Sequence, residues 1–238
     1  MFLRQSAQLS CVSLVLLAVS WAIAAEQEII YSDSGVCSKA VSWGHPRVKR
    51  QTIQRQSGFT NDEKMAILQR HNDLRAKEGS SNMRRMHWDS ALEVLAQSYS
   101  EKCDFKHSPL SYRTNVLDFK YIGENIYAGT ATFDPLTPVQ LWWDEYTFYD
   151  FNTRRCTGVC GHYTQVVWDK SFALGCGFHY CKNLTGAPNF NRGYNVVCHY
   201  GPGGNIAGLK PYLKGEACTA CPKETAFCVN GLCASTGE

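Results

Sequence analysis

The stretch Gly161-His162-Tyr163-Thr164-Gln165-Val166-Val167-Trp168 follows directly on Cys160 and is rich in aromatic and β-branched residues. This composition, bounded by a glycine, predicts a strand over Tyr163–Trp168. Runs of the same kind, also bounded by glycine or polar turns, occur at three other places in the chain: Tyr121–Ala128, Ala173–Cys181 and Tyr194–Tyr200. The sequence therefore predicts several short strands around the middle of the chain.

Helical patterns alternate with these runs. Thr60-Asn61-Asp62-Glu63 reads as a capping box, in which the threonine hydroxyl and the glutamate carboxylate satisfy the free amides of a first helical turn. The residues after it that repeat with a period near 3.6, and so predict a helix to about Lys77, are Met65, Ile67, Leu68, His71 and Leu74. His71 is expected to be a packing residue rather than a functional one.

Two more helices are predicted. One starts at an Asp89 cap, ends near Cys103 and carries Leu92, Leu95, Ala96 and Tyr99 on its inner face. The other covers Pro138–Tyr149, with Val139, Trp142, Trp143 and Tyr146 packing inward. Mixed helices and short strands without regular βαβ repeats indicate an α+β sandwich.

From Cys218 onward the composition changes. Four cysteines fall in a segment with few core-forming side chains: Cys218, Cys221, Cys228 and Cys233. Such a segment needs disulfides to hold it. The Cys218-Thr219-Ala220-Cys221 spacing also occurs in redox and zinc motifs of cytosolic proteins, but in a secreted chain it indicates structural disulfides.

The N-terminus indicates secretion. Arg4 precedes an apolar run, Cys11–Ala24, that ends in Ala22-Ile23-Ala24, and this is the pattern of a signal peptide over residues 1–24. A membrane anchor is the alternative, but the run has only about 14 apolar residues, whereas a spanning helix needs about 20. No later stretch is longer and equally apolar, so we expect no transmembrane anchor.

A second processing signal follows at Arg47-Val48-Lys49-Arg50, a basic cluster of the kind that secretory convertases cleave. The chain has 12 cysteines. Loss of Cys11 with the signal peptide leaves an odd number, and loss of Cys37 with a propeptide restores an even one, as full pairing requires. We therefore expect a propeptide over residues 25–50, cleavage after Arg50, a main domain over 51–213 and a cysteine-rich tail over 214–238. A solvated basic turn is the alternative for the basic cluster.

The charge is mild. The formal net charge is +3, and lysines and arginines are dispersed, so nucleic acid is not an expected partner. Asn183-Leu184-Thr185 is an N-x-[ST] sequon in a polar stretch, and we expect Asn183 to be glycosylated in a secreted chain.

Four motifs in order resemble those of one family. The octapeptide at 161–168 with Gly175-Cys176-Gly177 resembles the first signature of the CAP superfamily of cysteine-rich secretory and pathogenesis-related proteins, and Tyr194–Asn205 resembles the second. His71–Arg75 and Gly123–Tyr127 match two further family motifs. The resemblance covers roughly residues 60–213 and is strongest to the glioma pathogenesis-related and cysteine-rich secretory groups.

The resemblance implies an α-β-α sandwich, the CAP fold, with a short hinge-like disulfide-rich tail. It also implies five disulfides: Cys103–Cys181, Cys156–Cys160, Cys176–Cys198, Cys218–Cys228 and Cys221–Cys233. The tail stops at Glu238 without the further cysteine-rich module that cysteine-rich secretory proteins use on ion channels, so ion-channel regulation is not expected.

Family members carry a cleft with two histidines and two glutamates, and the matching positions here are His107, Glu124, Glu145 and His162. His107 and His162 would be the ligands of a zinc ion, held with low affinity because two imidazoles bind more weakly than three or four protein ligands. A hydrogen-bonded cluster that only stabilises the sandwich is the alternative. Ser108, next to His107, is a poor candidate for a nucleophile acting with a His/Glu pair, because a hydroxyl adjacent in sequence usually points elsewhere.

Several functions fit these residues. The leading prediction is a secreted binding or effector protein of the defence, reproductive or venom type, with an unknown extracellular protein or lipid as partner. The aromatic segment Tyr146–Phe151 would line a groove for a sterol or fatty acid, or else end a buried helix. Alternatives are a secreted endoprotease, with the four cleft residues catalytic, and a protease inhibitor.

Overall fold

A computed structural model describes residues 55–130, 134–187 and 191–235. The predicted signal peptide, the propeptide and the Arg50 cleavage site lie outside the described residues. Among the described residues, no helix combines the length and the apolar character needed to cross a bilayer.

The first helix begins where the capping box predicts. Helix α1 spans Asn61–Ala76, Thr60 accepts a hydrogen bond from the Glu63 amide, and the Glu63 carboxylate accepts one from the Thr60 amide at 2.8 Å. Helix α2 spans Ser90–Ser100, and the Asp89 carboxylate accepts the amides of Ala91 and Leu92. Each cap satisfies amides that the helix itself leaves unpaired.

The central sheet has the strand order β1-β7-β8-β4. Its strands are β1 (His87–Trp88), β7 (Ala173–Cys181), β8 (Gly193–Gly201) and β4 (Gly123–Gly129). Strand β1 runs parallel to β7, and the other neighbours are antiparallel. Three of the four predicted strands are found, although the first is divided, because Tyr121 ends β3 and β4 begins at Gly123.

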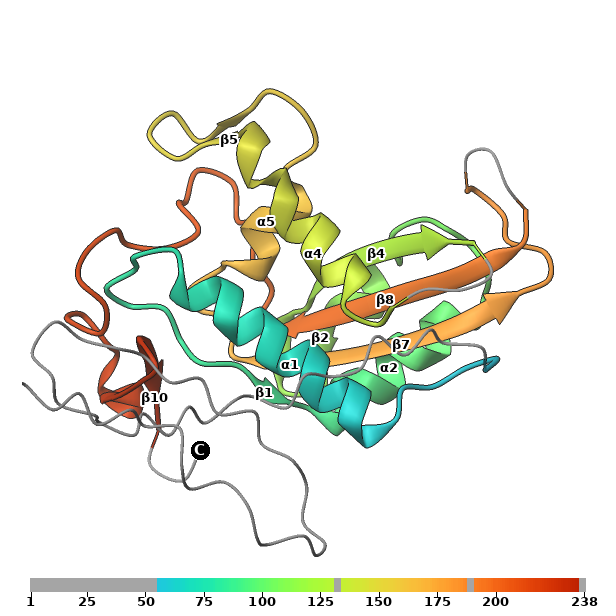
Figure 1. Ribbon diagram of the computed structural model, residues 1–238, viewed down its shortest axis with the longest axis horizontal. Helices are drawn as coiled ribbons and strands as arrows, with labels where there is room; N and C mark the ends of the chain where they lie inside the picture. The colour runs from blue at the N-terminus through green and yellow to red at the C-terminus, as the bar shows by residue number, and fades with distance from the viewer. Residues whose placement is uncertain (1–54, 131–133, 188–190, 236–238) are drawn as a thin grey trace, which may run out of the picture. The chain divides into compact units, whose positions relative to one another are not determined.

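Helices cover both faces of the sheet (Figure 1). On one face lie α1, α4 (Thr137–Asp144) and α5 (Gly161–Val166), and their side chains share a core with β7 and β8. On the other face lies α2, whose Ala96 and Tyr99 pack against Val197 of β8. The α-β-α sandwich predicted from the resemblance is therefore confirmed.

Shorter elements complete the main domain. They are α3 (Leu110–Arg113), β2 (Thr114–Val116), β3 (Phe119–Tyr121), the 3-10 helix η1 (Glu145–Phe148), β5 (Tyr149–Asp150) and β6 (Arg155–Cys156). Strands β2 and β3 form one antiparallel hairpin and β5 and β6 another. The tail contributes η2 (Lys223–Thr225), β9 (Phe227–Val229) and β10 (Leu232–Ala234).

Two glycines bring α2 against the sheet. Gly175 and Gly177 lie two residues apart on β7, so they face the same side. A Cβ atom at Gly175 would lie 2.2 Å from the backbone nitrogen of Glu93, and one at Gly177 would lie 2.4 Å from the Cα of Gln97. Both contacted atoms belong to the backbone of α2, so the absence of side chains at these positions sets how closely the helix approaches.

The five disulfide pairs implied by the resemblance are all present among the described residues. Cys103–Cys181 joins the end of α2 to the end of β7, and Cys176–Cys198 links paired positions of β7 and β8. The tail carries two disulfides and also packs on the main domain, because Leu232 joins the core and the Cys233 amide donates to Met83 O at 2.8 Å.

Three sequence predictions are wrong. The sequence predicts a strand over Tyr163–Trp168, but Gly161–Val166 is the helix α5. Met65 is 60% exposed and does not belong to the inner face of α1. The helix predicted to reach Tyr149 ends at Asp144 and continues as η1, which leaves Tyr146 46% exposed instead of packed inward.

Tertiary contacts explain why α5 is helical. The Glu145 carboxylate accepts the backbone amide of His162 at 3.0 Å at the start of the helix. At its end, the guanidinium of Arg75 donates to the carbonyls of Val166 and Trp168. Both ends of this short helix are therefore satisfied by side chains from distant segments, which outweighs the β propensity of its residues.

His71 is a buried packing residue, as predicted. Its Nδ1 lies 2.9 Å from Ile67 O and its Nε2 3.0 Å from the Tyr200 hydroxyl. Burial lowers the pKa of His71 to about 4, so the ring is neutral at pH 7.

Candidate functional site

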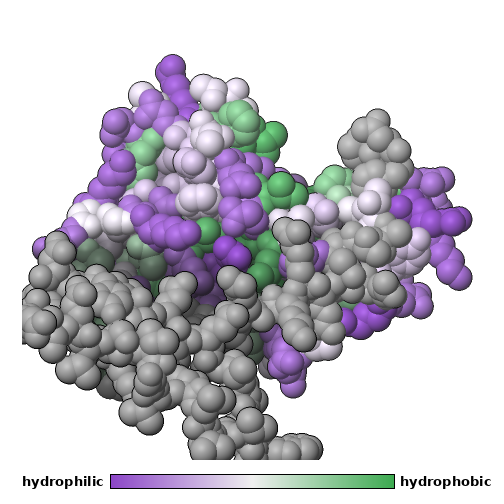
Figure 2. Space-filling model, in the orientation of Figure 1, coloured by the Kyte–Doolittle hydropathy of each residue, from purple (hydrophilic) through white to green (hydrophobic). Residues whose placement is uncertain are grey.

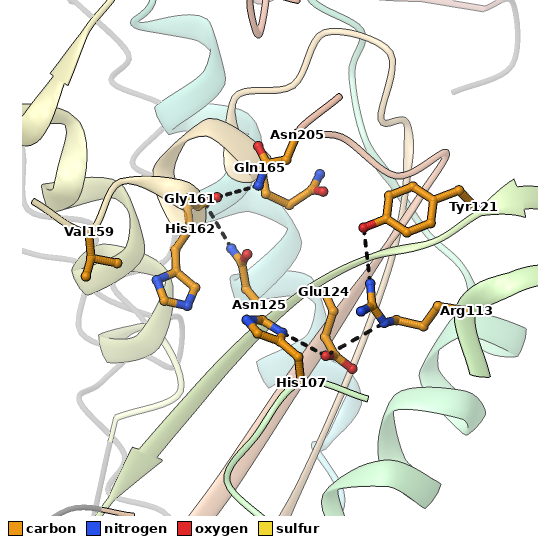
Figure 3. Close-up of a pocket in the computed structure, with 10 residues that line it drawn as sticks. All are labelled: His107, Arg113, Tyr121, Glu124, Asn125, Val159, Gly161, His162, Gln165 and Asn205. Atoms are coloured by element: carbon orange, nitrogen blue, oxygen red, sulfur yellow. Dashed lines mark hydrogen bonds and ion pairs between the residues drawn. The ribbon is translucent and has the colours of Figure 1, made fainter. Parts of the chain in front are cut away.

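A cleft of about 270 Å³ lies beside the edge strand β4. Residues from several elements line it: His107, Arg113, Tyr121, Glu124, Asn125, Val159, Gly161, His162, Gln165 and Asn205. Figure 3 shows His107 beside Glu124 on one side of the cleft and His162 on the other, with Asn125 between them.

The first histidine–glutamate pair comes from the loop after α2 and from β4. His107 Nδ1 lies 2.9 Å from Glu124 Oε1, and the Ser108 amide donates to the same oxygen at 2.8 Å. The Glu124 side chain is fully buried, whereas that of His107 is 54% exposed. Glu124 thus holds the Nδ1 side of the His107 ring, and the other side of this ring is open to the cleft.

The second pair comes from η1 and α5. His162 Nδ1 lies 2.6 Å from Glu145 Oε1, while Glu145 Oε2 accepts the backbone amides of His162 and Tyr163. The Trp142 ring stacks beside the His162 ring with centroids 6.2 Å apart. Glu145 therefore caps α5 and orients His162 at the same time.

The structure brings the two pairs together across the cleft. The ring centroids of His107 and His162 are 6.4 Å apart, with an angle of 31° between the planes. In both rings the Nδ1 atom is engaged by a glutamate, so the Nε2 atom is the one left for a ligand. All four residues that the resemblance pointed to therefore belong to one constellation.

The protonation state of Glu124 follows from its surroundings. Burial alone would raise the pKa of Glu124, but hydrogen bonds from His107, His199 and Ser108 outweigh it and hold the pKa well below its usual range. Arg113 Nε, 3.8 Å from Oε1, adds a positive charge nearby. Glu124 is thus an ionised acceptor at neutral pH.

His199 is a member of this cluster that sequence reasoning missed. It lies on β8 opposite Glu124 in the register of the sheet, is fully buried, and places Nε2 3.1 Å from Glu124 Oε2. The sequence distance from Glu124 carries no hint of this contact. Only the pairing of β4 with β8 brings the two side chains together.

Ser108 does not have the arrangement of a nucleophile. Its hydroxyl oxygen accepts a hydrogen bond from Arg113 Nε at 2.8 Å, its carbonyl accepts one from Arg113 Nη2, and the side chain is buried. Ser108 therefore holds Arg113 and Glu124 in place at the base of the cleft.

A third carboxylate supports the wall behind His162. Glu78, just after α1, accepts hydrogen bonds from the Tyr163 hydroxyl at 2.8 Å, the Tyr212 hydroxyl at 2.9 Å and Trp143 Nε1 at 3.0 Å. Burial, followed by the charge of Glu78, raises the pKa of both tyrosines, so they stay protonated and donate. Gln165, which lines the cleft, accepts the Gly204 amide at 2.9 Å.

The aromatic segment at 146–151 follows the buried helix α4 through η1, and only Tyr149 and Phe151 in it pack against the main core. Tyr146 and Phe148 are each 46% exposed, whereas Phe151 packs against Tyr212 with centroids 4.8 Å apart. Figure 2 shows hydrophobic and hydrophilic residues side by side over this part of the molecule. The sequon residue Asn183 is exposed in the loop after β7.

Among the described residues, the group of three or more histidine, cysteine or acidic side chains close enough to share a metal is Cys218, Cys221 and Cys233. All three are in disulfides and do not offer thiolates. Within the described ranges, the histidines of the cleft are the better candidates for metal ligands.

The chain matches one known protein family over most of the main domain. The model of the family described as CAP, the cysteine-rich secretory protein family, matches residues 68–200. This chain belongs to the CAP family.

Similar proteins include members of the two groups that the motifs resemble. The chain is 40% identical over 172 residues to GLIPR1-like protein 1 of Homo sapiens, covering 70% of this chain and 69% of the relative. It is 40% identical over 169 residues to glioma pathogenesis-related protein 1 of Mus musculus, covering 70% and 62%. It is 36% identical over 176 residues to cysteine-rich secretory protein 1 of Mus musculus, covering 71% and 67%.

Solved structures share the fold. The crystal structure of Na-ASP-1 matches with a TM-score of 0.61 and 28% identity, covering 74% of this chain and 48% of that one. The crystal structure of NaASP2 with Zn2+ matches with a TM-score of 0.57 and 28% identity, covering 74% and 97%.

Proposed function

We propose that this chain is a secreted CAP effector protein whose cleft binds a divalent metal, zinc above all, through Nε2 of His107 and Nε2 of His162. The observation that carries the proposal is that a glutamate engages Nδ1 of each ring. A carboxylate on one ring nitrogen orients the imidazole and makes the other nitrogen a better metal ligand.

The separation of the rings fits one shared ion. Two imidazoles on one zinc have ring centres about 5–6 Å apart, given zinc–nitrogen distances of about 2.1 Å. The observed separation is 6.4 Å, and His107 is open enough to adjust. A metal with two protein ligands keeps positions for water or for a partner's group, so we expect low affinity and a role in binding.

A structural relative supports the choice of metal. The crystal structure of NaASP2 is described as containing Zn2+, and that protein is 28% identical to this chain. The tail cysteines do not compete for zinc, because they are paired in disulfides.

Secretion is supported by the disulfides. The five bonds that the described residues contain require an oxidising compartment. We propose that the signal peptide over 1–24 and a propeptide ending at Arg50 are removed and that the exposed Asn183 carries a glycan. The partner is an extracellular protein or lipid.

The test uses the full chain expressed in mammalian cells and purified from the medium, where mass spectrometry is expected to give Gln51 as the first residue. After removal of metal, zinc is titrated by calorimetry. We expect one zinc per chain and a loss of affinity of more than about 100-fold in His107→Ala and in His162→Ala.

His179→Ala is the matched control, because this histidine lies on β7 and does not line the cleft. Absence of zinc binding by the wild-type protein, or unchanged binding by folded His107→Ala, would contradict the proposal. The same samples are incubated with a diverse peptide pool and zinc. If the wild-type protein cleaves peptides at specific sites and the double variant His107→Ala/His162→Ala does not, the cleft is proteolytic and the binding role is wrong.

A sterol or a related lipid is the second ligand that we propose, supported by the exposure of Tyr146 and Phe148. Tyr146 and Phe148 lie two residues apart in η1 and together offer more apolar area than one exposed ring does. The secreted protein is expected to extract radiolabelled cholesterol from vesicles, and Tyr146→Ser/Phe148→Ser is expected to lose most of this activity. Phe227→Ser, which changes a 54% exposed ring on the tail, is the control. Equal extraction of cholesterol by the Tyr146→Ser/Phe148→Ser protein and the Phe227→Ser protein would show that the lipid does not bind at Tyr146 and Phe148.

A further inference from the structure

The buried histidine His199 completes the hydrogen bonding of Glu124. Glu124 Oε1 accepts from the Ser108 amide and from His107 Nδ1, while Oε2 has His199 Nε2 as its partner at 3.1 Å. The side chains of Glu124 and His199 are both fully buried, so water does not replace a lost donor there. His199 therefore decides whether the second oxygen of Glu124 is satisfied.

The direction of these hydrogen bonds fixes two tautomers. Glu124 Oε1 already accepts the Ser108 amide, so His107 donates to this oxygen from Nδ1, and His199 in the same arrangement donates to Oε2 from Nε2. A neutral imidazole has one N–H, so His107 then presents Nε2 to the cleft as a lone pair, the form that a metal requires. The carboxylate must stay in one orientation to keep His107 in that tautomer.

The contacts of His199 are concentrated on Nε2. His199 Nδ1 is buried and has no hydrogen-bond partner among the described residues. Nδ1 therefore contributes no polar contact that would favour a histidine at this position. What the histidine supplies is the donor at Nε2, aimed at Glu124.

We propose that His199 is a positioning residue of the cleft: it holds Glu124 Oε2, keeps Oε1 on His107 Nδ1, and thereby fixes the tautomer of His107 that binds metal. The metal-binding half of this inference rests on the proposed function. The tautomer half concerns the metal-free protein and stands independently of it.

Two substitutions separate the donor from the rest of the ring. In His199→Gln the side-chain amide reaches about as far as Nε2 and still donates to Glu124, whereas in His199→Asn it reaches only about as far as Nδ1. Both variants keep a polar side chain at the same place in β8. They are compared for unfolding by urea, for zinc affinity by calorimetry, and for the His107 tautomer by long-range proton–nitrogen NMR of the metal-free protein.

We expect His107 in the wild-type protein to show the tautomer protonated at Nδ1. In His199→Asn we expect a mixture of tautomers and zinc affinity about 10–100-fold weaker, the range typical of lost contacts behind a metal ligand. His199→Gln is expected to retain the wild-type tautomer and to bind zinc within about threefold of the wild-type protein.

A folded His199→Asn protein with wild-type tautomer and wild-type zinc affinity would overturn the proposal. If that variant does not fold, the spectrum of the wild-type protein still decides, because His199 protonated at Nδ1 instead of Nε2 would exclude the hydrogen bond on which the inference rests. If the wild-type protein binds no zinc, the metal-binding function fails while the tautomer of His107 in the two variants still tests the role of His199.

Discussion

Replacement of Gly175 by alanine is expected to lower the free energy of unfolding by about 4 kcal/mol, a large fraction of the stability of an ordinary domain. The added Cβ would lie 2.2 Å from Glu93 N, 2.5 Å from Leu92 C and 2.7 Å from Asp89 O, all of them backbone atoms at the start of α2. Backbone atoms cannot rotate away as a side chain does, so the whole helix must move off β7 and lose its packing.

The measurement is urea unfolding of the secreted protein with disulfides intact, together with the melting temperature, which we expect to fall by about 10 °C. Gly161→Ala is the control, because the nearest atom to a Cβ at that position is Asn205 Nδ2 at 3.8 Å. A Gly175→Ala protein as stable as the Gly161→Ala protein would show that α2 does not rest on this glycine.

Arg75→Met is the second substitution with a large expected effect. Arg75 is fully buried in α1, and its guanidinium donates to backbone carbonyls of five residues: Arg84, Val166, Trp168, Asp169 and Ser171. Burial lowers the pKa of Arg75 to about 9, which leaves the group charged at pH 7. Methionine has a similar size and a good helix propensity, so the substitution mainly removes the donors.

Loss of these donors leaves several buried carbonyls without partners, each at a cost of about 1–3 kcal/mol, so we expect at least about 4 kcal/mol of destabilisation. The carbonyl of Val166 ends α5 and that of Trp168 lies two residues beyond it, so His162 is expected to become more mobile and zinc binding to weaken as well. Arg75→Lys is expected to rescue little, because one ammonium cannot span the same acceptors.

Arg70→Met, on the partly exposed side of the same helix, is the control for changes in charge and helix propensity. Unfolding by urea and zinc titration are compared for the three variants. Equal stability of the Arg70→Met and Arg75→Met proteins would refute the role that we assign to this guanidinium.

Local signals in the sequence predicted their elements well. The capping box at Thr60–Glu63 and the Asp89 cap place the starts of α1 and α2, because both depend on contacts within one helical turn. The runs at 173–181 and 194–200 predict β7 and β8, because buried strands consist of residues with β propensity. The helical structure of α5 could not be predicted from Tyr163–Trp168, since the groups that cap this helix belong to Glu145 and Arg75.

The sequence likewise predicts only part of the candidate site. The motifs pointed to His107, Glu124, Glu145 and His162 through resemblance, but their spacing along the chain says nothing about which histidine meets which glutamate. The sequence does not indicate His199, because its partner Glu124 lies on the neighbouring strand. The role of Gly175 and Gly177 in seating α2 was equally invisible, because it depends on which backbone lies against β7.

Residue patterns and motifs predict the family, the main helices, three of four strands and the residue types of the cleft, because all of these rest on local propensity or on motif identity. The folded arrangement alone makes α5 a helix, joins His199 to Glu124 and brings the two cleft histidines together. These features depend on contacts between segments far apart in the chain, and such contacts exist only once the sheet and its covering helices have assembled.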